Sequence, residues 1–312
     1  MSFKQSDLYD KIKMVSEDVI NTEILSICPF ENITNNRVFK LTAHEKSYIF
    51  KIYNSGWPET GKLPFVSMKL DEQQIPHAKI FIFNRENSYF PNGYLIEECL
   101  PGTTADRLAL STSETMELFK KIAKLVSKVH KIKLTNYGYI GDGIAEWTTF
   151  SEYVYDSFED CTANLLSHKL ISKKEYEKVR HELHYKLSIC DQFPAVLCHG
   201  DLSLKNVLVN QDDITLIDWD DAHSLCCVAD VARLTLWMKL NYDVYSSSAY
   251  RKAFLENYKT EYDMSSFEAL EDVLHVWYGY DCLNFFVGKP QYENMKSILQ
   301  KSLSKCEMQV FL

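Results

Sequence analysis

Three polar side chains, closely spaced along the chain, have the chemistry needed for phosphoryl transfer. Asp201 follows His199 and Gly200, Asn206 comes five residues later, and Asp218 stands at the end of a hydrophobic run. An ionised aspartate can orient a hydroxyl and receive its proton late, so Asp201 is the candidate base. Carboxylate and amide oxygens are hard ligands, so Asn206 and Asp218 are the candidate Mg²⁺ ligands. The metal is needed because carboxylates and a nucleoside triphosphate repel one another.

Short strands are expected to position these three groups. A hydrophobic strand at 195–198 leads into the loop 199–206. The next two runs, 207–209 and 214–217, are expected to form a hairpin whose second arm ends at Asp218. The two acids and the amide then emerge from neighbouring strand ends, where a metal and a phosphate can lie between them.

The hydrophobic pattern changes once along the rest of the chain. Short strand-like runs in about the first hundred residues predict a small antiparallel sheet, and after Pro101 and Gly102 the spacing becomes helical. The expected fold class is α+β, with a small N-terminal lobe at residues 1–99 and a larger, mainly helical lobe at 100–312. The predicted strands are 38–41, 47–53, 78–83 and 93–97, and helices are predicted after the capping boxes Ser111-x-x-Glu114 and Ser172-x-x-Glu175 and over 267–278.

Composition excludes several classes of protein. The net charge of −9 comes without a basic cluster, which argues against nucleic acid as a partner. The nine cysteines are scattered and odd in number, so we expect neither a disulfide framework nor a zinc site, and a cytoplasmic location. The sequence contains no run of about 18 apolar residues, so we expect no membrane-spanning helix.

Two segments of the chain resemble the aminoglycoside phosphotransferase and choline kinase family, which is related to the protein kinases. They are residues 199–209, HGDLSLKNVLV, and residues 216–222, LIDWDDA. The segments at 94–102 and 129–138 resemble the family's hinge and the region after its first long helix. The sequence of the second motif, in which Trp219 follows the candidate metal ligand Asp218, is most similar to that of the antibiotic kinases, including the hygromycin type. The resemblance implies a protein-kinase-like, two-lobed fold.

The resemblance also implies roles for further residues. Lys51 stands where the family holds the α and β phosphates of the nucleotide. The backbones of Glu98 and Leu100 stand where the hinge binds adenine. Ser203 stands where a side chain can touch the transferring phosphate, although a serine that stabilises the turn is equally expected. The implied donor is ATP or GTP, with Mg²⁺ as the cofactor, and the sequence does not decide between the two nucleotides.

Two features depart from the family pattern. The loop at 31–37, expected to cover the phosphates, contains no glycine, although Asn35 and Asn36 can replace one because asparagine tolerates positive φ. The acid that pairs with Lys51 is either Glu59 or Glu72, and neither has the expected spacing. The missing glycine leaves open a non-catalytic, kinase-like module that binds a nucleotide.

A second catalytic architecture is also open. Residues 56–62 read G-x-x-x-x-G-K, as in a phosphate-binding P-loop whose lysine is Lys62. Leu63 follows, where a P-loop needs a serine or threonine for Mg²⁺, so this motif is incomplete.

The acceptor is expected to be a small, cationic molecule with a hydroxyl, bound by acids and aromatic residues of the late helices. An aminoglycoside-type antibiotic is the leading expectation, and a choline, homoserine or sugar-amine kinase of the same fold is the alternative. A monomer and a dimer are both consistent with the sequence. The residues considered for the acceptor are Asp220, Asp221, Asp263, Glu268, Glu271, Asp272, Trp277, Tyr278, Tyr280, Asp281 and Glu293.

Overall fold

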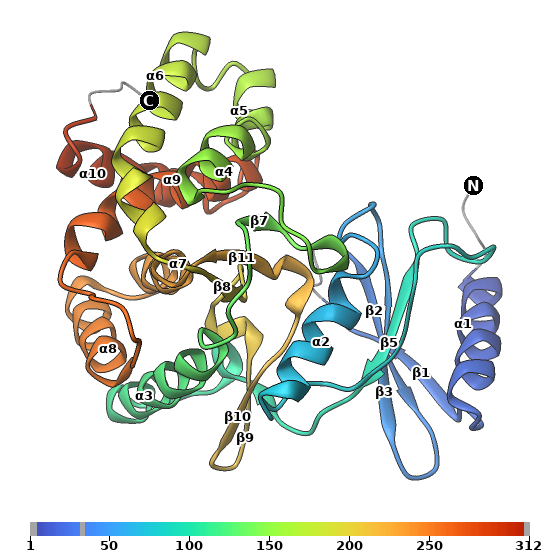
Figure 1. The fold of residues 1–312 in the computed structure, drawn as a ribbon. Coiled ribbons are helices and arrows are strands. Elements are labelled where there is room, and N and C mark those ends of the chain that lie inside the picture. Colours follow the sequence, from blue (N-terminus) through green and yellow to red (C-terminus); the bar gives the residue numbers. More distant parts are fainter. Residues whose placement is uncertain (1–4, 32–34, 309–312) are drawn as a thin grey trace. The chain divides into compact units, whose positions relative to one another are not determined.

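The computed structural model describes residues 5–31 and 35–308 of the chain (Figure 1). The chain divides into two compact units. The N-terminal unit comprises Met1–Thr104, Gly141–Gly143 and Leu208–Asp220, and the C-terminal unit comprises Ala105–Ile140, Ile144–Val207 and Asp221–Leu312. Residues 32–34 of the glycine-free loop lie outside the described residues. None of the described helices is both long and apolar enough to cross a membrane.

The N-terminal unit is built on a five-stranded antiparallel sheet in the order β1-β2-β3-β5-β4. Its four predicted strands are confirmed to within a few residues. A second, three-stranded sheet, in the order β10-β9-β6, contains the predicted hairpin. The strands are β1 (Ser26–Pro29), β2 (Arg37–Thr42), β3 (Ser47–Ile52), β4 (Ile80–Asn84), β5 (Tyr94–Glu98), β6 (Thr103–Thr104), β9 (Val207–Asn210) and β10 (Asp213–Leu216).

The two faces of the five-stranded sheet are covered by different helices, α1 (Gln5–Ile20) and α2 (Lys62–Glu72) (Figure 1). Side chains alternate between the faces of a strand. Phe50 therefore points into the apolar core that α1 covers, together with Phe39 and Ile96. Lys51 points to the opposite face, where the side chains of α2 line a cavity with it. This alternation places a lysine beneath α2 and an apolar core beneath α1.

The C-terminal unit is mainly helical, with a small antiparallel sheet in the order β7-β11-β8. Both predicted capping boxes are present and begin α3 and α6. Helix α3 packs on α8, and α9 packs on α7 and α10. The elements are α3 (Thr112–Val129), β7 (Gly138–Tyr139), α4 (Phe150–Ser157), α5 (Ala163–Ser167), α6 (Lys173–Leu187), β8 (Ala195–Cys198), β11 (His223–Cys226), α7 (Cys227–Asn241), α8 (Val244–Asn257), α9 (Phe267–Phe285) and α10 (Tyr292–Lys305). All nine cysteines are free thiols in the structure.

Candidate active site

Lys51 is the centre of a charged cluster in the N-terminal unit. Its ammonium donates to Asp218 Oδ1 at 2.7 Å and to Asp220 Oδ2 at 3.1 Å. Burial acts to lower the pKa of Lys51, but the negative charges of Asp218 and Asp220 outweigh burial and hold that pKa well above its ordinary value. The Tyr53 hydroxyl donates to the other oxygen of Asp220 at 3.1 Å. Lys51 is therefore a charged group held directly on the predicted metal ligand Asp218.

Neither of the two glutamates considered as partners of Lys51 forms that pair. Glu59 lies 2.7 Å from the ammonium of Lys62, and Glu72 lies 2.9 Å from that of Lys69. The acid that pairs with Lys51, where a glutamate was expected, is Asp220, two residues after Asp218. Sequence reasoning considered Asp220 only as a contact of the acceptor.

Glu97 belongs to the same cluster and lines a small cavity with Lys51 and Asp218. Burial raises the pKa of Glu97 to about 7, against the opposing charge of Lys51. The hinge residues Glu98 and Leu100 lie just beyond it and line a separate cavity of about 430 Å³. Lys51 of β3 and Glu97 and Glu98 of β5 therefore lie on neighbouring strands of one sheet, and Leu100 lies two residues beyond the end of β5.

The P-loop interpretation of residues 56–62 is wrong. Lys62 is fully buried at the start of α2, and its ammonium lies 3.5 Å from the centre of the Trp57 ring. The ammonium also lies 2.7 Å from Glu59 Oε2 and donates to the backbone carbonyl of Asp220 at 3.4 Å. A lysine enclosed in this way cannot present its charge to a phosphate, and it instead ties α2 to the segment that follows Asp218.

Asp201 is the centre of a second charged cluster, in the C-terminal unit. Lys205 lies 2.8 Å from one carboxylate oxygen, and Arg233 of α7 lies 3.4 Å from the other. Burial acts to raise the pKa of Asp201, but the charges of Arg233 and Lys205 outweigh burial and hold it below the ordinary value. Asp201 is therefore ionised at neutral pH, in the form required to orient a hydroxyl.

The backbone around Asp201 is fixed by a glycine and by a buried acid. Gly200 has φ +79, and a Cβ placed there would lie 1.8 Å from the carbonyl oxygen of Asp221. The carboxylate of Asp230 accepts the backbone N–H groups of His199 at 2.9 Å and Gly200 at 3.0 Å. Asp230 therefore anchors the turn that presents Asp201.

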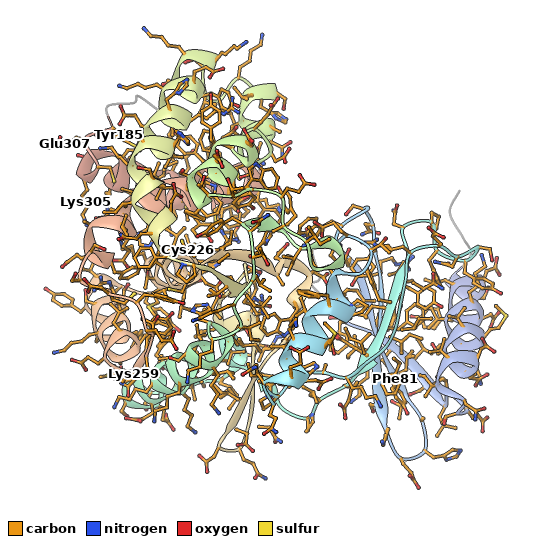
Figure 2. All side chains as sticks on the ribbon, viewed as in Figure 1. Phe81, Tyr185, Cys226, Lys259, Lys305 and Glu307 are labelled. Atoms are coloured by element: carbon orange, nitrogen blue, oxygen red, sulfur yellow. The ribbon has the colours of Figure 1, made fainter. Side chains whose placement is uncertain are left out.

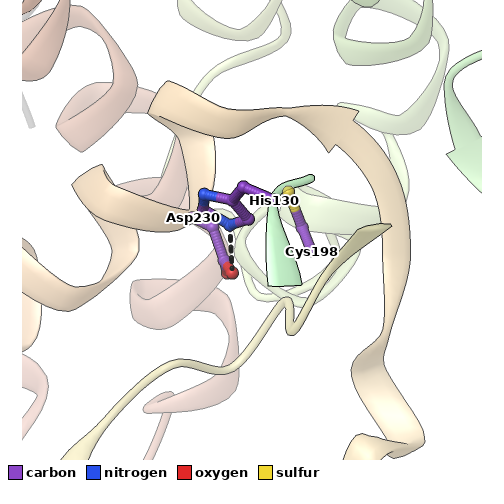
Figure 3. A group of neighbouring side chains, drawn as sticks. All are labelled: His130, Cys198 and Asp230. Carbon is purple, nitrogen blue, oxygen red and sulfur yellow. Dashed lines mark hydrogen bonds and ion pairs between the residues drawn. The ribbon is translucent and has the colours of Figure 1, made fainter. Parts of the chain in front are cut away.

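Figure 3 shows Asp230 beside His130 and Cys198, three buried side chains whose donor atoms lie within 4.8 Å of one another. His130 Nε2 lies 3.2 Å from the same Asp230 oxygen that binds the His199 amide, and its Nδ1 lies 2.7 Å from the Tyr258 hydroxyl. Since both Asp230 oxygens and both imidazole nitrogens have hydrogen-bond partners, we interpret this group as part of the support of the turn.

The predicted metal ligands have the chemistry that Mg²⁺ requires. Asn206 donates its amide nitrogen to the backbone and side chain of Asp201, at 2.8 and 3.0 Å. Its carbonyl oxygen, which accepts no hydrogen bond from a described residue, is the atom left for a metal. The side chain of Asp218 is 49% exposed and its φ is +63, so its carboxylate lies on a tight turn after β10. An amide oxygen and an exposed carboxylate are hard ligands, and they fit Mg²⁺. Asn206 belongs to the C-terminal unit and Asp218 to the N-terminal unit.

Most of the acids and aromatic residues expected to bind the acceptor have structural partners instead. Glu271 binds Arg251 at 2.8 Å, and Asp272 binds Lys239 and Lys305 at 3.4 and 3.0 Å. Asp281 differs, because Arg233 places it next to Asp201: the guanidinium lies 3.3 Å from Asp281 and 3.4 Å from Asp201. The aromatic residues of this set, Trp277, Tyr278 and Tyr280, are buried in the core.

Asp281 lies in a negatively charged and aromatic environment. Its side chain is 44% exposed. Partial burial and the negative charges of Asp221 and Asp201 raise the pKa of Asp281, while the positive charge of Arg233 opposes that rise. Asp281 in turn contributes, after burial, to a raised pKa at Tyr139 and Tyr153, whose ring centres are 5.7 Å apart. The sequence included Asp281 among many acids, but Arg233 and Lys205 were missed as partners of Asp201. The spacing of Lys205, four residues after Asp201, was the one available signal.

The chain is similar to known phosphotransferases along most of its length. The model of the phosphotransferase enzyme family matches residues 26–270. A mutant aminoglycoside phosphotransferase, APH(4)-Ia, in a complex with ADP and hygromycin B, superimposes with a TM-score of 0.72 at 14% identity, covering 96% of this chain and 99% of the other. No curated protein matches the sequence.

Two kinases that are named for other substrates have the same fold. A putative fructosamine-3-kinase from Thermobifida fusca gives a TM-score of 0.68 at 14% identity, covering 96% of this chain and 99% of the other. The choline kinase LicA from Streptococcus pneumoniae gives 0.63 at 16%, covering 97% and 100%. At these identities the neighbours establish the kinase-like α+β fold and leave the acceptor undetermined. Together with the family match, they show that the chain belongs to the phosphotransferase enzyme family and is a small-molecule kinase.

Proposed function

We propose that the protein is a cytoplasmic enzyme that transfers the γ-phosphate of ATP or GTP to a hydroxyl of a cationic small molecule. The acceptor we favour is an aminoglycoside-type antibiotic. The N-terminal lobe, residues 1–99, binds the nucleotide, and residues 100–312 contribute catalysis and the acceptor site. The observation that supports this most is the environment of Asp201: a carboxylate held ionised, and linked through Arg233 to Asp281.

Each residue has one task in this proposal. Asp201 orients the acceptor hydroxyl and takes its proton as the bond to phosphorus forms. Asn206 and Asp218 hold Mg²⁺, which neutralises charge on the phosphates, and Lys51 binds the α and β phosphates. The backbones of Glu98 and Leu100 bind the purine. Ser203 contacts the transferring phosphate or the acceptor.

The charge around Asp281 supports a cationic acceptor. The charges of Asp221 and Asp201 both act on Asp281, and Asp160 acts with Asp281 on Tyr139. An acceptor ammonium beside Asp281 gains ion pairing and contact with aromatic rings. A neutral acceptor gains neither. Choline, homoserine and ketosugar amines also carry an amine, so kinases for these metabolites are the alternative, supported by the two metabolite-kinase neighbours.

The direct test is nucleotide consumption with Asp201→Ala. Wild-type protein is screened with ATP and with GTP against hygromycin B, choline, homoserine and a ketosugar amine. Loss of a positioned base lowers turnover at least about a hundredfold. The melting temperature is expected to stay close to wild type, which separates catalysis from folding. A variant that keeps wild-type turnover would remove Asp201 from the mechanism.

The acceptor class is tested separately with Asp281→Asn. This change keeps the size of the side chain and removes its charge, so the KM for an amine-bearing acceptor is expected to rise at least about tenfold. The Kd for ADP, whose proposed ligands lie elsewhere, is expected to stay the same. Equal KM values in both proteins would contradict a cationic acceptor at this position.

A further inference from the structure

Helix α7 carries Arg233, which contacts Asp201, but apolar packing does little to fix the rotation of this helix about its own axis. Every residue from 227 to 236 is buried, so this stretch has no exposed polar face. Hydrophobic contacts have no direction, and a helix that is buried on all sides can pack nearly as well after a rotation. A shift of one residue would turn it by about 100° and carry Arg233 away from Asp201. Directional polar contacts are therefore needed to hold α7, and Asp230 provides them only at its first turn.

The next two turns of α7 are held by His275 of α9, whose imidazole is completely buried. Its Nε2 lies 3.1 Å from the backbone carbonyl oxygen of Ala232 and 2.9 Å from the Thr235 hydroxyl. Its Nδ1 lies 3.0 Å from the ammonium of Lys239. Ala232 and Thr235 stand on either side of Arg233 in the sequence. His275 therefore binds the part of α7 from which Arg233 extends.

The partners of His275 fix its protonation state. An ammonium has only donors, so Lys239 donates to Nδ1, and the imidazole carries its single hydrogen on Nε2, facing the Ala232 carbonyl. Burial and the positive charge of Lys239 hold the pKa of His275 well below its ordinary value, against the negative charge of Asp272. The ring is therefore neutral, and because both nitrogens are used it has one orientation.

Charged residues of the neighbouring helices surround this ring. Asp272 lies 3.4 Å from Lys239 and 3.0 Å from Lys305 at the end of α10, which is labelled in Figure 2. Glu271 lies 4.0 Å from the ring Nε2 and 2.8 Å from Arg251 of α8. The network thus joins α7 to α8, α9 and α10. Apolar residues of similar size often give equal or greater stability than such buried ionic groups, so the network is better explained by the helix arrangement that it specifies.

We propose that His275 is a positioning residue, which holds α7 at the rotation at which Arg233 reaches Asp201. The inference rests on the proposed function, in which Asp201 is the base. The contact tolerates little movement, because the guanidinium is already 3.4 Å from the carboxylate. That guanidinium lies well outside the helix radius of about 2.3 Å, so a rotation of about 15° displaces it by more than about 1 Å. Asp201 then loses a cation that orients it and keeps it ionised.

The first measurement needs no turnover and compares crystal structures of the wild type, His275→Leu and His275→Gln. Leucine fills much of the space without a hydrogen bond, so the Arg233–Asp201 distance is expected to exceed about 4 Å. Glutamine can place an N–H near the position of Nε2, so it is expected to restore the bond to the backbone of α7 and the wild-type distance. His184→Leu is the matched control, because it removes an imidazole of the same unit that bonds to the backbone of Ser151 rather than to α7.

The second measurement is turnover. His275→Leu is expected to lower kcat at least about tenfold. The Kd for ADP is expected to change less than about threefold, because Lys51 and the hinge, the proposed ADP ligands, belong to the N-terminal unit. Since the effect passes through Arg233, a double variant with Arg233→Met is expected to have the kcat of Arg233→Met alone. A protein that is merely destabilised would lose kcat in both backgrounds. Lys239→Met repeats both measurements with a milder change, because its side chain is 32% exposed and only the Nδ1 contact is lost.

Two results would overturn the positioning role: an Arg233–Asp201 distance that stays below about 4 Å in both His275→Leu and Lys239→Met, or losses of kcat that add in the double variant. The two measurements also separate this role from the proposed function. A changed distance in a protein that consumes no nucleotide with any acceptor would support the positioning of α7 and count against the proposed function. Wild-type kcat in His275→Leu, with the distance unchanged, would do the reverse.

Discussion

Replacing Arg233 by methionine tests whether the charge of this residue sets the pKa of the base. Methionine is unbranched and apolar, so it fills much of the buried space and removes only the charge and its hydrogen bonds. Arg233 lies 3.4 Å from Asp201, and at an effective dielectric constant of about 20 a pair at that distance interacts by about 5 kcal/mol. This attraction favours the ionised carboxylate, so its loss raises the pKa of Asp201. Lys205 remains in the variant and solvent will compensate for part of the loss, so we expect the pKa of Asp201 to rise by less than the full interaction energy would give.

The pH dependence of kcat/KM for nucleotide consumption measures this rise. The acidic limb of the profile reports the pKa of the free base, so it is expected to move to higher pH in Arg233→Met, with the rate recovering above the new pKa. Arg180→Met is the matched control, since Arg180 lies 3.7 Å from a half-exposed aspartate, Asp156. That variant is expected to leave the profile unchanged. An acidic limb that stays in place, or moves to lower pH, in Arg233→Met would refute the electrostatic role of Arg233.

Four other changes test the structure: three lie in the N-terminal unit, and the last, Gly200→Ala, lies in the C-terminal unit. Lys51→Met is expected to weaken ADP binding at least about tenfold, as measured by calorimetry. Lys62→Met is expected to change the Kd for ADP by less than about threefold. It is expected to lower the free energy of unfolding by about 1–3 kcal/mol, measured by thermal unfolding, because it leaves Glu59 unpaired. Because the pKa of Glu97 is about 7 in the folded protein and about 4.5 in the unfolded one, the folded state binds more protons between these values and stability falls as pH rises through them. Glu97→Gln is expected to gain up to about 3 kcal/mol at pH 8 and almost nothing at pH 4, and a gain that does not depend on pH would contradict this. Gly200→Ala is expected to prevent soluble expression, because its Cβ would overlap the backbone of Asp221.

Local patterns in the sequence predicted the elements whose two faces differ. The strands of the main sheet alternate, because one face covers an apolar core, and α3 and α6 begin at capping boxes. Helix α7 was missed because its residues are buried on nearly every side, which removes the helical period, and because it follows β11 without a turn.

Spacing predicted the parts of the site that are close in the sequence. Asn206 donates a hydrogen bond to Asp201, five residues away. Arg233 reaches Asp201 from 32 residues away, and Lys51 reaches Asp220 across 169, and such contacts depend on how whole elements pack. The motif at residues 56–62 suggested a P-loop for the same reason, since a glycine-lysine pair gives no information about whether the lysine is buried.

The salt bridges of Lys51 also limit how this region can change. Two carboxylates that share one ammonium repel each other once that ammonium is removed. A mutation at position 51 that removes the positive charge is therefore expected to alter the turn after β10 as well as phosphate affinity. An inactive protein made by replacing this lysine would be a poor reference state for structural work, whereas a change at the base would leave the turn intact.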